Sequence, residues 1–130
     1  MKKAIALLLA LVMVFALCAC GGGGDSAGGD KVVKIGVFEP ASGDSGAGGK
    51  KEMLGMQYAN QETPTVEIGG ETYKVELVYS DNGSDSAKAV SAASKLVNEK
   101  VSLVLGSYGS GVSIAASDTF KQAGIPAIGV

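Results

Sequence analysis

The pattern of apolar and polar positions changes at about residue 30 and from there alternates between strand-like and helix-like segments. Short runs rich in β-branched residues recur between longer segments whose apolar residues return every three or four positions. Strands that alternate with helices are typical of an α/β protein built on a parallel sheet. We therefore predict strands at 32–38, 65–68, 71–79, 101–105 and 127–130, and helices at 50–62, 86–98 and 110–123.

Local signals at the ends of these segments support the assignment. Gly69-Gly70 is a two-residue turn that tolerates positive φ, so the strands on either side of it should form a hairpin. Ser84 or Asp85 is suited to cap the second helix, and Gly124 to end the third. The apolar stripes predict the inward faces of the three helices: Leu54 and Tyr58 flanked by Met53, Met56 and Ala59; Ala89, Ala93, Leu96 and Val97; Val112, Ala116, Phe120 and Ala123.

The last predicted strand is apolar, and no helix follows that would cover it. We therefore expect residues 31–130 to be the N-terminal part of a larger, truncated lobe.

The segment before residue 31 has a different character. Met1-Lys2-Lys3 is followed by an apolar run over 4–19 and then by Cys20. The sequence Leu17-Cys18-Ala19-Cys20 resembles the lipobox of bacterial lipoproteins. This predicts a signal peptide at 1–19 and lipidation of Cys20, which would leave the protein exported and lipid-anchored to the outer face of the bacterial cytoplasmic membrane. Residues 20–30, rich in Gly, Ser and Asp, would form a flexible spacer.

Two other interpretations of this leader stay open. The apolar run could be a transmembrane anchor, although it is at the short end of the roughly 17–25 residues that a span requires. It could also be an ordinary cleaved signal, although no A-x-A pattern precedes a suitable site.

Composition limits the chemistry that the folded part can perform. The chain has no His, Arg or Trp, and both Cys lie in the leader region. A Ser-His-Asp triad and the usual zinc site are therefore excluded, and we expect no metal and no cofactor. Without Lys2 and Lys3, nine lysines face thirteen acidic residues, a net charge of about −4, which argues against a nucleic-acid partner.

Two glycine-rich loops follow predicted strands, where doubly wound sheets bind ligands. The first, within 39–49, does not fit a phosphate-binding loop. In that register Asp44 replaces the first glycine and Lys51 replaces the Ser or Thr that holds magnesium. A flexible connection between strand and helix is the better interpretation.

The second loop, Gly106-Ser107-Tyr108-Gly109-Ser110-Gly111, leads into the N-terminus of the third helix. Free N–H groups and hydroxyls at such a terminus suit an anion, for example a ligand carboxylate. Alternatively, Ser110 only caps its own helix, and the spacing does not decide between the two.

Several of these motifs together resemble one family. They are Lys34-Ile35-Gly36-Val37, Ser42-Gly43, the segment 86–97, Val104 to Gly111, Ala115-Ala116-Ser117 and Gly124-Ile125-Pro126-Ala127-Ile128. They resemble the branched-chain amino-acid binding proteins of ABC importers, which are type I periplasmic solute-binding proteins. The resemblance covers essentially all of 31–130 and is most specific over 106–126.

The resemblance implies a Rossmann-like lobe of a two-lobed protein, not an enzyme. Such a protein captures an amino acid, branched-chain or related, and delivers it to the membrane permease of an ABC importer. In that family a serine at the position of Ser110 binds the ligand's carboxylate, and Tyr108, Gly109 and Gly111 fall beside it. An aromatic residue commonly lies in the first loop, at a position that matches Gly48. A sensory ligand-binding domain of the same fold is an alternative, and an exported nucleotide-using α/β enzyme is a more distant one.

Overall fold

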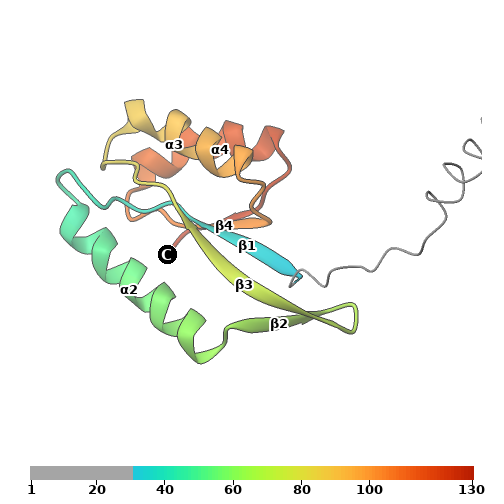
Figure 1. The fold of residues 1–130 in the computed structure, drawn as a ribbon. Helices are drawn as coiled ribbons and strands as arrows, with labels where there is room; N and C mark the ends of the chain where they lie inside the picture. Colours follow the sequence, from blue (N-terminus) through green and yellow to red (C-terminus); the bar gives the residue numbers. More distant parts are fainter. Residues whose placement is uncertain (1–30) are drawn as a thin grey trace, which may run out of the picture.

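The computed structural model describes residues 31–130. The predicted signal peptide, the lipidation at Cys20 and the spacer up to residue 30 lie outside the described residues. Within 31–130 strands alternate with helices as the sequence predicts (Figure 1). The elements are β1 (Val32–Val37), α2 (Gly46–Glu62), β2 (Thr65–Ile68), β3 (Glu71–Tyr79), α3 (Ser86–Asn98), β4 (Leu103–Leu105), α4 (Ser110–Gln122) and β5 (Ala127–Ile128).

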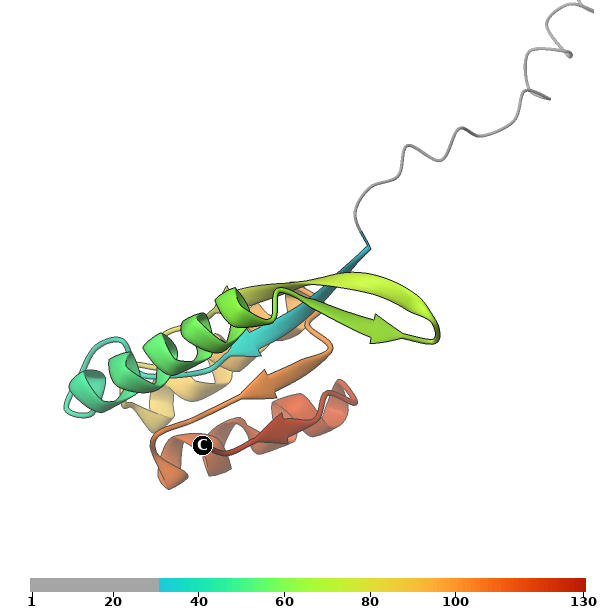
Figure 2. The ribbon, with the colours of Figure 1, turned by 90° about the horizontal axis from the view of Figure 1, so that it is seen from below.

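The strands form one sheet in the order β2-β3-β1-β4-β5. All neighbours are parallel except β2 and β3, which form the antiparallel hairpin around Gly69-Gly70. Helices α3 and α4 lie side by side on one face of the sheet, and α2 lies on the other (Figures 1 and 2). This confirms an α/β fold with a mostly parallel sheet, in which the carboxyl ends of β1, β3 and β4 are neighbours.

The core lies between the sheet and the pair α3 and α4. Leu96 and Val104 are fully buried there, and the rings of Phe38 and Phe120 meet edge to face with their centroids 5.5 Å apart. Truncating a buried residue of this kind to Ala typically costs about 2–5 kcal/mol. The predicted stripe of α3 is confirmed, and so is that of α4 except for Ala123, which is exposed because it follows the last helical residue.

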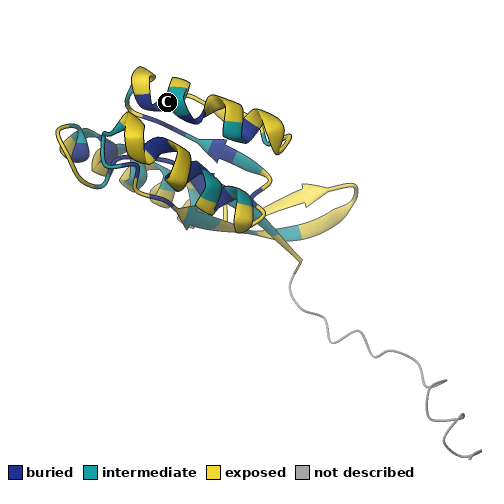
Figure 3. Ribbon diagram, turned by 90° about the horizontal axis from the view of Figure 1, so that it is seen from above, coloured by how far each residue is buried: buried dark blue, intermediate teal, exposed yellow. Residues whose placement is uncertain are grey.

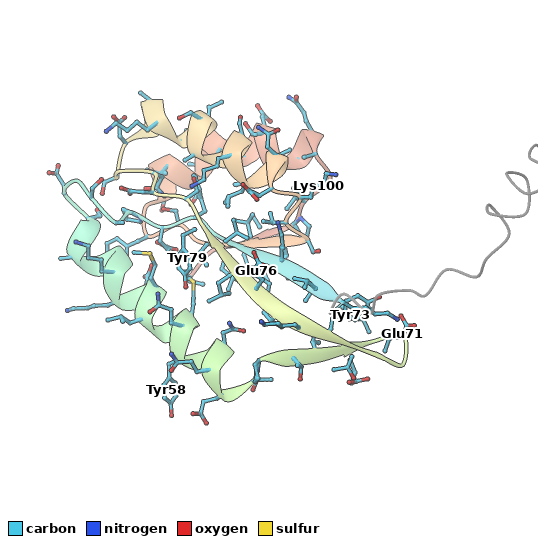
Figure 4. All side chains as sticks on the ribbon, in the orientation of Figure 1. Tyr58, Glu71, Tyr73, Glu76, Tyr79 and Lys100 are labelled. Atoms are coloured by element: carbon cyan, nitrogen blue, oxygen red, sulfur yellow. The ribbon has the colours of Figure 1, made fainter. Side chains whose placement is uncertain are left out.

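The predicted inward face of α2 is wrong for Leu54 and Tyr58, its two central residues. Leu54 is 63% exposed and Tyr58 is 65% exposed, and Figure 4 shows Tyr58 pointing away from the sheet. Only part of the helix faces the sheet, where Met56 and Ala59 line an apolar hollow of about 400 Å³. Figure 3 shows the contrast between the buried residues under α3 and α4 and the exposed hairpin of β2 and β3. The apolar spacing identified the helix but not the side on which it packs.

Helix α2 begins at Gly46, four residues before the predicted start at Lys50. Glycine disfavours a helix by about 1 kcal/mol relative to Ala. Here contacts with the preceding loop outweigh that preference. A Cβ at Gly49 would lie 2.3 Å from the carbonyl oxygen of Pro40, and one at Gly46 would lie 3.3 Å from Ala41. The glycines therefore allow the first turn of the helix to pack against the loop after β1.

The remaining boundaries differ little from the prediction. Helix α3 has the predicted bounds, and Asp85 rather than Ser84 caps it, with its carboxylate accepting from the N–H of Ala87 at 2.8 Å. The strands predicted at 101–105 and 127–130 are shorter in the structure. Gly124 has φ of +68° and ends α4 as expected. Within residues 31–130, no helix has the length and apolar character needed to span a membrane.

Candidate functional site

Three loops meet at the carboxyl edge of the sheet, one after each of the neighbouring strands β1, β3 and β4. Asp81, just after β3, holds the first loop through both carboxylate oxygens. Oδ1 accepts from the N–H of Ala41 at 2.8 Å and Oδ2 accepts from the hydroxyl of Ser42 at 2.7 Å. Partial burial acts to raise the pKa of Asp81, but these bonds and one from the N–H of Gly83 outweigh it and lower the pKa below its ordinary value. The Asp81 carboxylate thus connects the loop after β3 to the loop after β1.

The fully buried side-chain amide of Asn82 connects all three loops. Its Nδ2 donates to the carbonyl of Phe38 at 3.1 Å and to the hydroxyl of Ser107 at 2.9 Å. Its Oδ1 accepts from the N–H of Ser84, whose own hydroxyl accepts from the N–H of Ser45. A buried amide with partners on both sides restricts the loops more strongly than surface contacts do.

The loop of residues 106–109, which we call the β4–α4 loop, ends at the N-terminus of α4. Gly109 is the N-cap, and its carbonyl accepts from the N–H groups of Val112 and Ser113, each at 3.0 Å. Within residues 31–130 the hydroxyl and N–H of Ser110 and the N–H of Gly111 have no hydrogen-bond partner. Ser110 therefore does not cap its own helix, which leaves these groups for an anion.

A hollow of about 220 Å³ opens where the three loops converge. Tyr108, Gly109 and Gly111 line it, and Ser110 is exposed between two of these residues. Larger hollows lie under α2 and beside α4 and β5, but the polar groups of the three loops converge on this smaller one. Its other lining residues are Pro40, Ser45, Ser84, Ser86, Ser107 and Val112.

The aromatic surface of this site comes from the β4–α4 loop. The ring of Tyr108 lies over Gly48 of α2, where a Cβ would be 2.8 Å from Cζ of the ring. Tyr108 is about half exposed, so its ring contacts both the helix and the hollow. Gly48 is the position at which the resemblance places an aromatic residue, and the Tyr108 ring lies against that position.

Glu39 lies directly behind the β4–α4 loop. It is 1% exposed, and its Oε2 accepts from the N–H of Tyr108 at 2.8 Å. Burial raises the pKa of Glu39, the hydrogen bond from Tyr108 acts to lower it, and the neighbouring carboxyl of Glu52 raises it further, to about 7. A carboxyl with this pKa exchanges its proton at neutral pH.

Sequence reasoning missed Asp81, Asn82 and Glu39, which hold the loops together. In the sequence these three residues stand in the connections that follow predicted strands, without a motif that marks them as functional. A usable signal was present, because each follows a strand at the carboxyl edge of a parallel sheet, where polar side chains meet. The predicted residues 108–111, by contrast, all lie together at this edge.

Comparison with known proteins identifies the family of this chain. A model of the periplasmic binding protein family matches residues 32–130. The chain belongs to this family. A Leu/Ile/Val-binding protein homolog of Brucella abortus is 32% identical over 93 residues, which are 72% of this chain and 25% of that protein.

Solved structures of binding proteins resemble this chain in both sequence and fold. A leucine binding protein from Thermotoga maritima is 34% identical with a TM-score of 0.68, covering 75% of this chain and 27% of its own. The branched-chain amino acid transporter substrate binding protein LivJ from Streptococcus pneumoniae, solved with isoleucine, is 35% identical with a TM-score of 0.67, covering 76% of this chain and 28% of its own. The chain thus spans about a quarter of the length of these relatives. The family is one of substrate-binding proteins and not of enzymes.

Proposed function

We propose that this chain supplies part of the binding site of an extracytoplasmic protein that captures an amino acid, branched-chain or related. The observation that carries the proposal is the N-terminus of α4, where the Ser110 hydroxyl and the N–H groups of Ser110 and Gly111 are unpaired within residues 31–130, beside the hollow. The helix dipole contributes up to about 2 kcal/mol to a bound anion. Each hydrogen bond to a charged partner adds about 1.5–3 kcal/mol.

The apolar part of the hollow suits the side chain of such an amino acid. Pro40, Val112 and the ring of Tyr108 offer apolar surface next to the polar groups of the loops. An aliphatic or flat side chain would lie against this surface while its carboxylate faces α4. Leucine, the ligand for which the Thermotoga maritima protein is named, and isoleucine, which is bound in the LivJ structure, each have such a polar and an apolar end.

Three further parts of the proposal rest on the leader and on the family. We infer that residues 1–19 are a signal peptide, that Cys20 carries the lipid and that residues 20–30 are a spacer, so that the protein remains on the outer face of the cytoplasmic membrane. Residues 31–130 would then be the N-terminal part of a solute-binding lobe. A membrane permease of an ABC importer would receive the bound amino acid.

Isothermal calorimetry tests the binding site. The complete gene product is titrated with a panel of L-amino acids, and we expect heat from leucine, isoleucine, valine or a related compound. Ser110→Ala should weaken binding about tenfold, because it removes one hydrogen bond to a charged group. Ser91→Ala is the matched control, since Ser91 is exposed on α3 and its hydroxyl bonds locally to the carbonyl of Lys88. An absence of heat with every member of the panel, or unchanged affinity in Ser110→Ala, contradicts the assignment.

A further inference from the structure

Glu39 has one carboxylate oxygen in use and one without a partner. Oε2 accepts from the N–H of Tyr108, whereas Oε1 is buried and has no hydrogen bond among the described residues. The side chain is packed tightly, because a Cβ at Gly106 would lie 2.4 Å from Oε1. Gly106 has φ of +117°, a conformation that glycine adopts readily. The β4–α4 loop therefore begins on a glycine that is packed against this carboxyl.

A second carboxyl lies beside the first. Glu52 of α2 is within side-chain hydrogen-bonding reach of Glu39, and its Oε2 is also buried without a partner. Two carboxylates that share a buried space repel each other, so one of them retains a proton. That proton gives a hydrogen bond between the two side chains and provides partners for buried oxygens that otherwise have none.

Among residues 31–130, no lysine forms a salt bridge with either carboxyl of the pair. Helix α2 contributes Glu52, and the β4–α4 loop contributes the backbone N–H of Tyr108. Each of the two salt bridges within residues 31–130, Lys31 with Glu71 and Lys34 with Glu99, leaves this pair untouched. A bound proton is therefore what removes the repulsion between the carboxyl groups of Glu39 and Glu52.

We propose that Glu39 is a positioning residue for the β4–α4 loop, and that a proton shared with Glu52 holds it in that role. With the proton bound, the Glu39 carboxyl stays between Glu52 and the N–H of Tyr108 and fixes the backbone that leads to Ser110. When the proton leaves, repulsion from Glu52 moves the carboxylate and the loop loses its support. The predicted effect on ligand affinity rests on the proposed function, whereas the effect on the loop does not.

Glu39→Gln separates this role from simple packing. The amide oxygen accepts from the N–H of Tyr108 and the amide N–H donates to Glu52, so the variant reproduces the protonated pair at every pH. In the complete gene product, we expect wild-type affinity for its amino acid to fall about tenfold between about pH 6 and pH 8.5, the loss of one positioned contact. Glu39→Gln should keep the low-pH affinity throughout this range, and Glu52→Gln should do the same. Glu76→Gln, an exposed site on β3 (Figure 4), should behave as wild type.

Nuclear magnetic resonance without ligand decides the inference independently of binding. We expect the side-chain carbon of Glu39 and the backbone amide of Tyr108 to titrate together near neutral pH, and Glu52→Gln to move the midpoint of Glu39 downward. An amide of Tyr108 that does not shift with pH, or a Glu39 carbon that titrates in the ordinary range, overturns the proposal even if the amino acid binds. A coupled titration supports it even if no member of the amino-acid panel binds, in which case only the proposed function fails.

Discussion

Replacing a glycine of α2 with Ala should change the stability of the fold differently at Gly49, Gly55 and Gly48. Gly55 and Gly49 both lie in the helix, so replacing either with Ala brings the same gain in helix propensity, about 1 kcal/mol. A Cβ at Gly55 meets nothing within 4 Å, and we expect Gly55→Ala to stabilise the fold by about that amount. A Cβ at Gly49 would lie 2.3 Å from the backbone oxygen of Pro40, which cannot rotate away as a side chain can.

Gly49→Ala should therefore destabilise the protein. Overpacking of this kind costs about 1–3 kcal/mol and more where backbone must move, which exceeds the gain in helix propensity. Gly48→Ala lies between the two, because its Cβ meets the ring of Tyr108, a half-exposed side chain that can swing aside. We expect Gly48→Ala to change stability little and to displace the ring from the hollow.

Urea unfolding followed by circular dichroism measures these differences. For a domain of this size, 1 kcal/mol corresponds to a shift of about 4–8 °C in Tm, so thermal melts give an independent check. Equal stabilities of the Gly49→Ala and Gly55→Ala proteins, within about 0.5 kcal/mol, would refute the argument that close packing against Pro40 sets the start of α2.

Three other predictions concern the site and the leader. The raised pKa of Glu39 means that the folded chain binds this proton more tightly than the unfolded chain, so its stabilisation is complete below about pH 4.5 and is lost as the pH rises to about 7. The loss should be about 3 kcal/mol, and Glu39→Gln should flatten this part of the curve of unfolding free energy against pH; an unchanged slope would contradict it. Asn82→Ala should destabilise by about 2–3 kcal/mol in urea unfolding because it leaves buried partners unsatisfied, and exposed Asn98→Ala, its control, by less than about 0.5 kcal/mol. Metabolic labelling with a radioactive fatty acid should mark the protein in cells; Cys20→Ala should abolish the label and Cys18→Ala should retain it, and the reverse pattern would refute the choice of Cys20.

The sequence predicted most elements because local chemistry decides them. Helix α3 begins after a capping Asp85 and carries a single apolar stripe, and the hairpin has its two glycines between alternating strands. The place of the loop from Tyr108 to Gly111 was predictable because a loop between a parallel strand and a helix lies at the carboxyl edge of the sheet, whereas the choice of these residues as ligand contacts came from the resemblance. In these places neighbours along the chain carry the information.

The rest depends on contacts between residues that are distant in sequence. Gly46 and Gly49 are poor helix formers whose position is fixed by the loop after β1, and no local pattern reveals that loop's path. Asn82 reaches Phe38 and Ser107, which are 44 and 25 residues away. The exposure of Leu54 and Tyr58 depends on which part of α2 faces the sheet, whereas helical periodicity reports only that an apolar stripe exists.

The hydrogen bonds of Asn82 and Asp81 have a consequence for how quickly a ligand can be recognised. The loops are joined to one another by the protein's own side chains, so the α4 terminus and the Tyr108 ring present a formed surface. Little conformational entropy remains to be lost in this part of the protein when a ligand binds. Discrimination between similar amino acids at this surface should then appear in how long each one stays bound rather than in how fast it arrives.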